Sequence, residues 1–323
     1  MTNPESLYRT VRLIRRFEER AMQLVRAGEI AGGIHPYIGQ EAIAAGVCAV
    51  LRRQDIITST HRGHGHVLAK GVDPARLFAE LAGRSTGLNG GRGGSMHAAD
   101  FSLGIYGANA IVGAAGSIAT GALWALRRQG GDQIGVSFFG DGAVNEGALL
   151  EAFNLAALWQ VPILFVCENN GYATTMPVTG AVAGSITGRA AAFGMPTFEV
   201  DGQDVAAVFE VACQASLRAR GGPGPVFIEC STYRFDSHHT YEHQVRTDYR
   251  PAEELASGRS RDPVAIAGAR IEQGRRQQID AEIETTLDEA IDYALRSPHP
   301  DPAGALDHLY ATGLKPRLHD GSR

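Results

Sequence analysis

The spacing of apolar and polar positions divides the N-terminal part of this 323-residue chain into helices and a short strand. Apolar residues between Leu7 and Leu24 recur every three or four positions, which predicts an amphipathic helix over about residues 5–28. A second helix is expected over residues 40–51, followed by a strand over residues 56–59. These elements are scaffold and carry no chemistry by themselves.

Strands and helices alternate through the middle of the chain. Uninterrupted apolar runs at residues 134–139 and 161–167 predict buried strands, and residues 147–159 between them have helical periodicity. A further strand, helix and strand are expected at residues 197–200, 204–220 and 225–230. Strands separated by helices of this length form parallel βαβ units. We therefore predict an α/β fold with a mainly parallel sheet flanked by helices on both faces.

The pattern changes beyond Tyr233. Residues from there to about 261 are polar and charged without apolar periodicity, which predicts a long loop that orders on binding or is covered by a partner. Two helices are expected after it, over residues 264–273 and 279–295. We expect a single domain over residues 1–323, with a helical C-terminal extension over about 262–323.

Composition and charge exclude several classes of protein. A net charge of −5 without a basic run argues against nucleic acid as a partner. The N-terminus has no signal or transit layout and the four cysteines are far apart among apolar neighbours, so we expect a cytoplasmic protein with free thiols. Residues 101–126 carry no charge, but their many small and polar residues favour a buried segment over a membrane span.

Glycine is concentrated in one part of the chain, with 25 of its 40 residues between Gly28 and Gly147. Close backbone approach to a ligand or to another chain would explain this excess. Gly113, Ser117 and Gly121 are spaced four apart, which would give a helix a small-residue face for packing within the chain or against another subunit.

Two polar motifs end neighbouring strands of the predicted sheet. The GDG motif at 140–142 follows one strand and the ENN motif at 168–170 follows the next, with Asp141 29 residues before Asn170. A parallel sheet brings this carboxylate and carboxamide together as hard oxygen ligands for Mg²⁺. The glycines let backbone N–H groups approach a diphosphate bridged by that ion. Either motif alone is an ordinary turn, and the pair predicts a site.

The motifs and their surroundings resemble the alpha subunit of the thiamine diphosphate-dependent decarboxylase component of 2-oxoacid dehydrogenase complexes. The resemblance covers about residues 5–235, and it is closest to the acetoin dehydrogenase branch. It rests on the blocks GGIHPYIGQEA, TSTHRGHGHVLAKG, GGSMHAADFSLGIYGANAIVGA, FFGDGAVNEG and CENNGYA. It implies the thiamine diphosphate-binding fold, with thiamine diphosphate and Mg²⁺ as cofactors.

The resemblance also implies roles for single residues. It gives the Mg²⁺ ligands as Asp141, Asn170 and the backbone carbonyl of Tyr172. It gives the diphosphate contacts as Arg62, Gly142 and Ala143, with His35 beside them. Ala110 and Val112 correspond to residues that pack on the aminopyrimidine, and His64 and His238 correspond to catalytic histidines. Histidines suit this chemistry because thiazolium attack on a carbonyl needs proton donors with a pKa near neutrality.

The resemblance further implies that the active site is shared between chains. In this family a glutamate of the beta subunit bonds the aminopyrimidine, and this chain has no second pyrimidine-binding half. An α2β2 heterotetramer is therefore expected. It would cleave a bond next to a carbonyl in acetoin or a 2-oxoacid and pass the two-carbon acyl unit to a lipoyl-domain acyltransferase.

Three alternatives remain open from the sequence. Asp236, Ser237 and His239 depart from the family pattern, which would suit a transketolase-like transfer of a glycolyl unit from a ketose to an acyl carrier protein. His64 and His66 with His238 and His239 could instead form the zinc site of a hydrolase. The chain could also be a noncatalytic cofactor-binding subunit. No role is predicted for His239 or His243.

Overall fold

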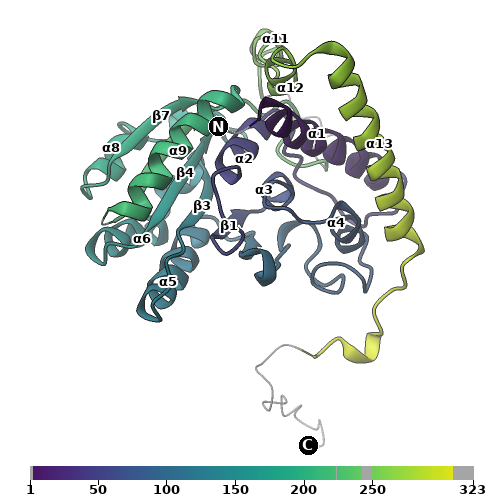
Figure 1. The fold of residues 1–323 in the computed structure, drawn as a ribbon, viewed down its shortest axis with the longest axis horizontal. Helices are drawn as coiled ribbons and strands as arrows, with labels where there is room; N and C mark the ends of the chain where they lie inside the picture. The colour runs from purple at the N-terminus through teal and green to yellow at the C-terminus, as the bar shows by residue number, and fades with distance from the viewer. Residues whose placement is uncertain (1–2, 223, 242–248, 308–323) are drawn as a thin grey trace, which may run out of the picture.

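A parallel sheet forms the centre of the computed structural model, which describes residues 3–222, 224–241 and 249–307 (Figure 1). The strand order is β2-β1-β3-β4-β8-β7, and all five pairings are parallel. The strands are β1 (Ile56–Thr60), β2 (Ile105–Asn109), β3 (Gly135–Gly140), β4 (Ile163–Asn169), β7 (Thr197–Asp201) and β8 (Val226–Ser231). This confirms the predicted α/β fold with a mainly parallel sheet.

Helices cover both faces of the sheet, as predicted. Helices α2 (Glu41–Cys48) and α9 (Val205–Gly221) pack on one face, and α5 (Ala114–Arg128), α6 (Gly147–Leu158) and α8 (Ile186–Ala191) on the other. Strand β4 shows why its sequence is continuously apolar. Leu164 and Val166 pack into the hydrophobic core on the α2 and α9 face, while Phe165 and Cys167 pack into the core on the α5, α6 and α8 face.

Short elements connect these layers. They are α3 (His64–Ala69), α4 (Pro74–Leu81), η1 (Gly94–Met96), η2 (Phe101–Leu103), η3 (Asp141–Asn145), α7 (Val178–Ala181) and η4 (Pro302–Gly304). A two-stranded antiparallel ribbon, β5 (Tyr172–Ala173) with β6 (Met176–Pro177), follows β4.

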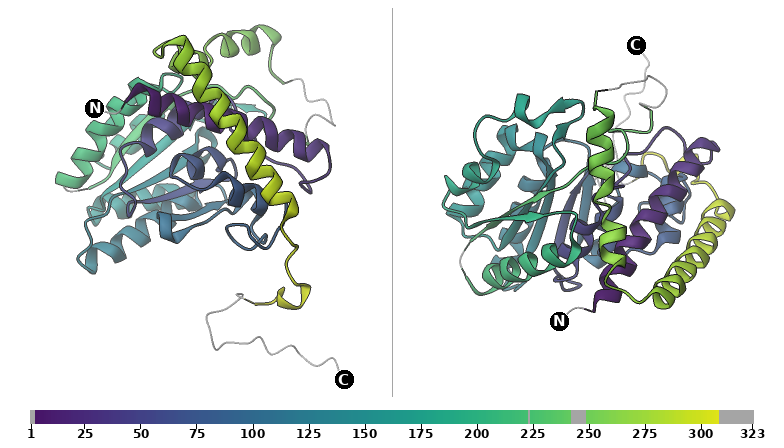
Figure 2. Two further views of the ribbon diagram at one scale, coloured as in Figure 1. Left: turned by 45° about the vertical axis from the view of Figure 1, so that its right-hand side comes forward. Right: turned by 90° about the horizontal axis from the view of Figure 1, so that it is seen from above.

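The N-terminal and C-terminal helices lie together. Helix α1 (Pro4–Arg26) contacts α12 (Pro263–Gly268) and α13 (Gln273–Arg296), and α13 also lies against α4 (Figure 2). The Tyr8 hydroxyl donates to Asp280 at 2.7 Å, and Arg16 pairs with Glu284. Residues 308–323 of the predicted C-terminal extension, like His243, lie outside the described residues.

Two predictions for the region after Tyr233 are wrong. Part of the expected loop is helix α11 (Ala252–Ser260), which has no buried residue and therefore no apolar periodicity to detect. The expected break between residues 273 and 279 is absent, because Glu272 caps α13 by accepting from Gly274 and Arg275 N–H, each at 2.9 Å.

The uncharged stretch at 101–126 forms η2, β2 and most of α5. Among the described residues, no helix is long and apolar enough to cross a membrane. Gly113 precedes α5 with a positive φ of 82°, so it belongs to the helix cap and not to a helix face. Ser117 and Gly121 are exposed, although the Ser117 hydroxyl donates to the Ala148 carbonyl oxygen of α6 at 3.2 Å, so the rest of the small-residue face is only partly covered within this chain.

Candidate active site

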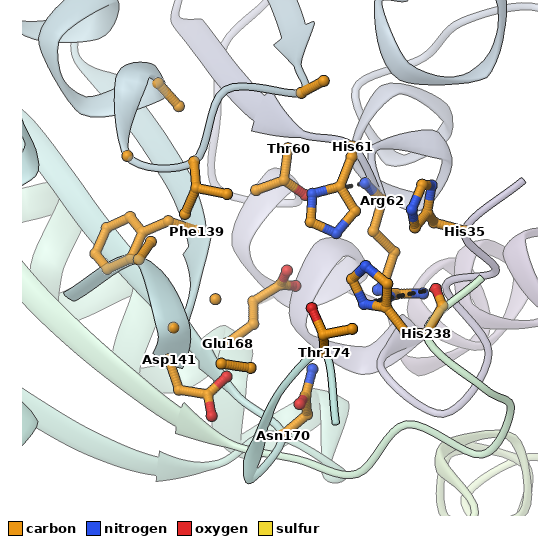
Figure 3. A pocket seen from close by; sticks show the side chains of 18 of the residues that line it. His35, Thr60, His61, Arg62, Phe139, Asp141, Glu168, Asn170, Thr174 and His238 are labelled. Atoms are coloured by element: carbon orange, nitrogen blue, oxygen red, sulfur yellow. Dashed lines mark hydrogen bonds between the residues drawn. The ribbon is translucent and has the colours of Figure 1, made fainter. Parts of the chain in front are cut away.

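A cavity of about 400 Å³ opens where β1, β3 and β4 end (Figure 3). This is the edge at which parallel α/β sheets bind ligands. Most of the residues singled out from the sequence line it: His35, Arg62, Ala110, Val112, Asp141, Gly142, Ala143, Asn170, Tyr172 and His238. The sheet thus gathers segments that are far apart in the sequence.

His64 is the exception among the sequence-predicted residues, because it does not line this cavity. Its side chain is fully buried, with Nδ1 at 3.1 Å from both carboxylate oxygens of Glu18 and Nε2 at 2.9 Å from Ser95 Oγ. Glu18 also accepts from Tyr37 N–H at 3.1 Å. In this structure His64 of α3 is bonded to α1 at Glu18 and to η1 at Ser95, and Glu18 in turn holds the segment before α2. A catalytic role for it stays a prediction.

Asp141 is buried without full satisfaction of its carboxylate. It is 1% exposed, and its Oδ2 has no hydrogen-bond partner among the described residues. Burial raises the pKa of Asp141 to about 6. A buried carboxylate oxygen without a partner is costly, so this position suits a cation that would complete it.

Asn170 directly follows β4, and Asp141 directly follows the neighbouring strand β3. Its Nδ2 donates to Gln40 Oε1 at 2.8 Å, and its Oδ1 accepts from Tyr172 N–H at 3.1 Å. Gly142 allows η3 to lie close to β5, since a Cβ there would be 2.8 Å from Ala173 Cβ. The donor set of one carboxylate, one carboxamide oxygen and backbone carbonyls fits Mg²⁺ chemistry.

Arg62 brings a buried positive charge to the same cavity. It is 4% exposed, and its Nη1 and Nη2 donate to the carbonyl oxygens of Pro36 at 2.6 Å and His238 at 3.0 Å. Burial lowers its pKa to about 9, so the guanidinium remains protonated at pH 7. Because these fixed contacts are to neutral groups, Arg62 is suited to an anionic ligand such as a diphosphate.

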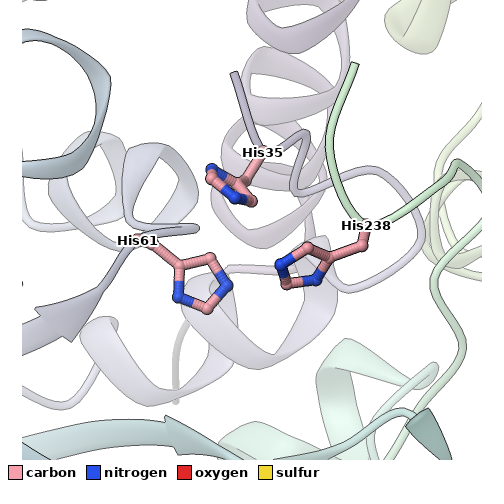
Figure 4. Close-up of side chains that lie close together, drawn as sticks. All are labelled: His35, His61 and His238. Carbon is pink, nitrogen blue, oxygen red and sulfur yellow. The ribbon is translucent and has the colours of Figure 1, made fainter. Parts of the chain in front are cut away.

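Three histidines, His35, His61 and His238, lie close together (Figure 4), and Arg62 lies beside them (Figure 3). The ring centroid of His35 is 4.5 Å from that of His61 and 4.9 Å from that of His238. Burial is the largest cause that lowers the pKa of His61 to about 3, that of His238 to about 2 and that of His35 far below its usual range. All three rings are therefore neutral at pH 7.

The zinc site considered from the sequence does not form. His66 is buried, with Nδ1 at 2.7 Å from Ser59 Oγ and Nε2 at 3.1 Å from Glu168, while His64 is held by Glu18. Neither belongs to the three-histidine group found in the described part of the chain.

The structure also adds residues that the sequence reasoning left without a role. His61, Gln40, Glu168 and Arg234 line the cavity. The position of His61 directly before Arg62 at the end of β1 is a signal that could have identified it. Asp236, Ser237 and His239 are not among the lining residues, so they give no support to a more hydroxylated donor.

Comparison with known proteins identifies the family. The model for the dehydrogenase E1 component matches residues 9–303. The chain belongs to this family. The membership confirms the resemblance seen in the sequence and identifies the chain as a thiamine diphosphate-dependent oxidoreductase component.

Relatives of known name cover nearly the whole chain. The alpha subunit of acetoin:2,6-dichlorophenolindophenol oxidoreductase from Cupriavidus necator is 42% identical over 95% of this chain and 94% of its own length. Its counterpart in Bacillus subtilis is 40% identical over 95% and 93%. The alpha subunit of the pyruvate dehydrogenase E1 component from Rhizobium meliloti is 40% identical over 91% and 86%.

Proposed function

We propose that this chain is the alpha subunit of an acetoin-cleaving dehydrogenase, which binds the diphosphate end of thiamine diphosphate through Mg²⁺ and is active with a beta subunit. The observation that carries the proposal is the combination, in one cavity, of the buried Arg62 guanidinium and the Asp141 carboxylate, whose Oδ2 has no partner among the described residues. A Mg²⁺ diphosphate satisfies both at once, because it offers a cation to one and phosphate oxygens to the other.

The binding roles follow from the lining residues. Asp141, Asn170 and the Tyr172 carbonyl would hold Mg²⁺, and Arg62, His35 and the backbone of Gly142 and Ala143 would contact the diphosphate. Ala110 and Val112 would pack against the aminopyrimidine. The bound cofactor supplies a nucleophilic carbon that attacks the donor carbonyl and then accepts its electrons.

The chain's own contribution to the reaction is to position groups and to move protons. His238 and His61 are neutral, so each offers one nitrogen that can donate and one that can accept at the oxygen of the donor carbonyl. Arg62 holds the His238 backbone and thereby fixes where that ring lies. His64 lies outside the cavity lining and would help to hold the surrounding segments in place through its hydrogen bonds to Glu18 and Ser95.

The donor is assigned from the relatives. Two alpha subunits of acetoin oxidoreductases match at 42% and 40% identity, and the pyruvate dehydrogenase subunit matches at 40%. We place acetoin first and a 2-oxoacid second, with a lipoyl domain as the acceptor of the two-carbon unit. The chain would act as one domain within an α2β2 assembly. The four free cysteines support a reducing compartment such as the cytoplasm.

The experiment is a comparison of donors in the assembled enzyme. The alpha chain is produced with its beta subunit, and the reduction of dichlorophenolindophenol is followed with acetoin, pyruvate, hydroxypyruvate and a ketose phosphate. We expect kcat/KM for acetoin to exceed that for each other donor by at least about tenfold, since one pocket contact is worth 1–3 kcal/mol. Activity should require Mg²⁺, thiamine diphosphate and both chains. Preference for the ketose would establish the ketol transferase instead.

A further inference from the structure

The three cavity histidines have the composition of a metal site that is separate from the Mg²⁺ position. One nitrogen from each of His35, His61 and His238 lies within 4.8 Å of the other two (Figure 4). Imidazole nitrogen prefers zinc and other late transition metals, whereas carboxylate and carbonyl oxygens prefer Mg²⁺. The two kinds of ligand therefore separate the two ions within one cavity.

The spacing of the nitrogens is close to what zinc requires. Ligand nitrogens about 2.0–2.1 Å from a tetrahedral ion are about 3.4 Å from one another. Nitrogens that already lie within 4.8 Å need small rotations of the rings to reach this arrangement. Three histidines also leave the fourth position of the ion open for water or another oxygen ligand.

A second observation concerns His35. Its Nδ1 is buried and has no hydrogen-bond partner in the described part of the chain. A buried nitrogen without a partner is costly, and bonding to an ion would remove that cost. His35 also lies against His239, with ring centroids 4.5 Å apart, so this neighbouring ring limits the movement of His35.

Arg62 limits how tightly an ion can be held. Its Nη2 is 3.3 Å from His238 Nδ1 and 3.0 Å from the His238 carbonyl oxygen. The carbonyl keeps the guanidinium in place if the ring turns to bind a metal. The positive charge repels a cation, however, so we expect reversible binding in the micromolar range and not the tighter binding of a structural zinc site.

We propose that His35, His61 and His238 form a reversible zinc-binding site, in which the ion occupies the histidine side of the cavity and excludes other ligands from it. Zinc would then inhibit the enzyme by competing for space that a donor needs. The binding itself requires only this chain, so it can be tested independently of the proposed donor and of the cofactor site.

The test uses the full-length chain, stripped of metals and titrated with Zn²⁺ in excess Mg²⁺ without thiamine diphosphate. Calorimetry should give one Zn²⁺ per chain. Substitution of Co²⁺ should give the visible absorption of a tetrahedral site with nitrogen ligands. We expect His35→Asn, His61→Asn and His238→Asn each to weaken Zn²⁺ binding by at least about 100-fold. His97→Asn is the control, because His97 is exposed and outside this group.

Each result decides between two outcomes. Loss of the stoichiometric ion in the three variants, with retention in the control and unchanged circular dichroism, supports the site. Absence of a stoichiometric ion in the unmodified chain overturns it. Binding that survives all three substitutions, or that is lost in Asp141→Ala and kept in His61→Asn, also overturns it, because the ion would then lie elsewhere.

Discussion

The polar side of the cavity, where β1, β3 and β4 end, and the apolar side, at Ala110–Val112 after β2, differ in how far this chain encloses them. On the polar side, Asp141, Arg62 and Asn170 are at most 8% exposed. On the other side, Ile111 is 71% exposed and Val112 is 47% exposed, although both line the cavity. The chain therefore encloses the residues on the polar side of the cavity and leaves those on the apolar side exposed.

The exposure of apolar residues continues along α5, which follows the apolar side of the cavity in the chain. Its outer face presents Ile118 and Trp124, each 40% exposed, beside the small residues Ser117 and Gly121. Exposed apolar groups next to small residues are typical of a surface that another chain covers. On the polar side, the groups that would bind the cofactor are held in place by the sheet. On the apolar side, we propose that the beta subunit covers the exposed residues.

The largest expected effect follows from removing the Asp141 carboxylate on the polar side of the cavity. Asp141→Ala should weaken binding of Mg²⁺ and thiamine diphosphate by at least about 1,000-fold, because the ion would lose its charged ligand. Calorimetric titration with the beta subunit present measures this. Asp132→Ala, at an exposed surface ion pair with Arg52, is the control and should bind normally. Unchanged affinity in Asp141→Ala would show that the cofactor site is misassigned.

A smaller effect is expected from placing a charge on the apolar side of the cavity. Ile111→Asp should weaken association with the beta subunit by at least about 100-fold, since an unpaired carboxylate would be buried between the chains. Leu217→Asp on α9 is a matched control, because Leu217 is also 71% exposed. Sedimentation of mixtures of the two chains gives the comparison. If the two substitutions weakened association with the beta subunit equally, the apolar side of the cavity would not be the surface that the beta subunit covers.

The smallest effect concerns stability without cofactor. The pKa of Asp141 is about 6 in the folded chain and about 3.9 when unfolded, so the unfolded chain loses its proton first as pH rises. The free energy of unfolding should therefore fall between about pH 4 and pH 6. Asp141→Asn should be more stable than the parent by about 2 kcal/mol at pH 7.5 and equal to it near pH 4. Urea unfolding at the two pH values measures this, and a stability difference that is independent of pH would contradict it.

The sequence predicted β3 and β4 well because these strands are buried on both faces and appear as continuous apolar runs, whereas it did not predict the partly buried β2. It predicted Asp141 and Asn170 because GDG and ENN end adjacent strands, and the family resemblance gave the other predicted lining residues, such as Arg62 and His238. Helix α11 could not be predicted in this way, since it is held at Glu254 by the hydroxyls of Tyr172 and Tyr233 and has no buried residue. The sequence also did not predict that His35, His61 and His238 form one group, because these residues are far apart in the chain and are brought together only by the fold.

Strand β4 joins both hydrophobic cores to the cofactor site that we propose. Its side chains alternate between the two cores, and Asn170 follows directly at its end. A cavity made on either side, by Leu164→Ala or Phe165→Ala, would shift the same backbone. If the site binds Mg²⁺ as we propose, its affinity would therefore change through substitutions that never touch it, which would give selection a means of adjusting cofactor retention while every proposed ligand stays unchanged.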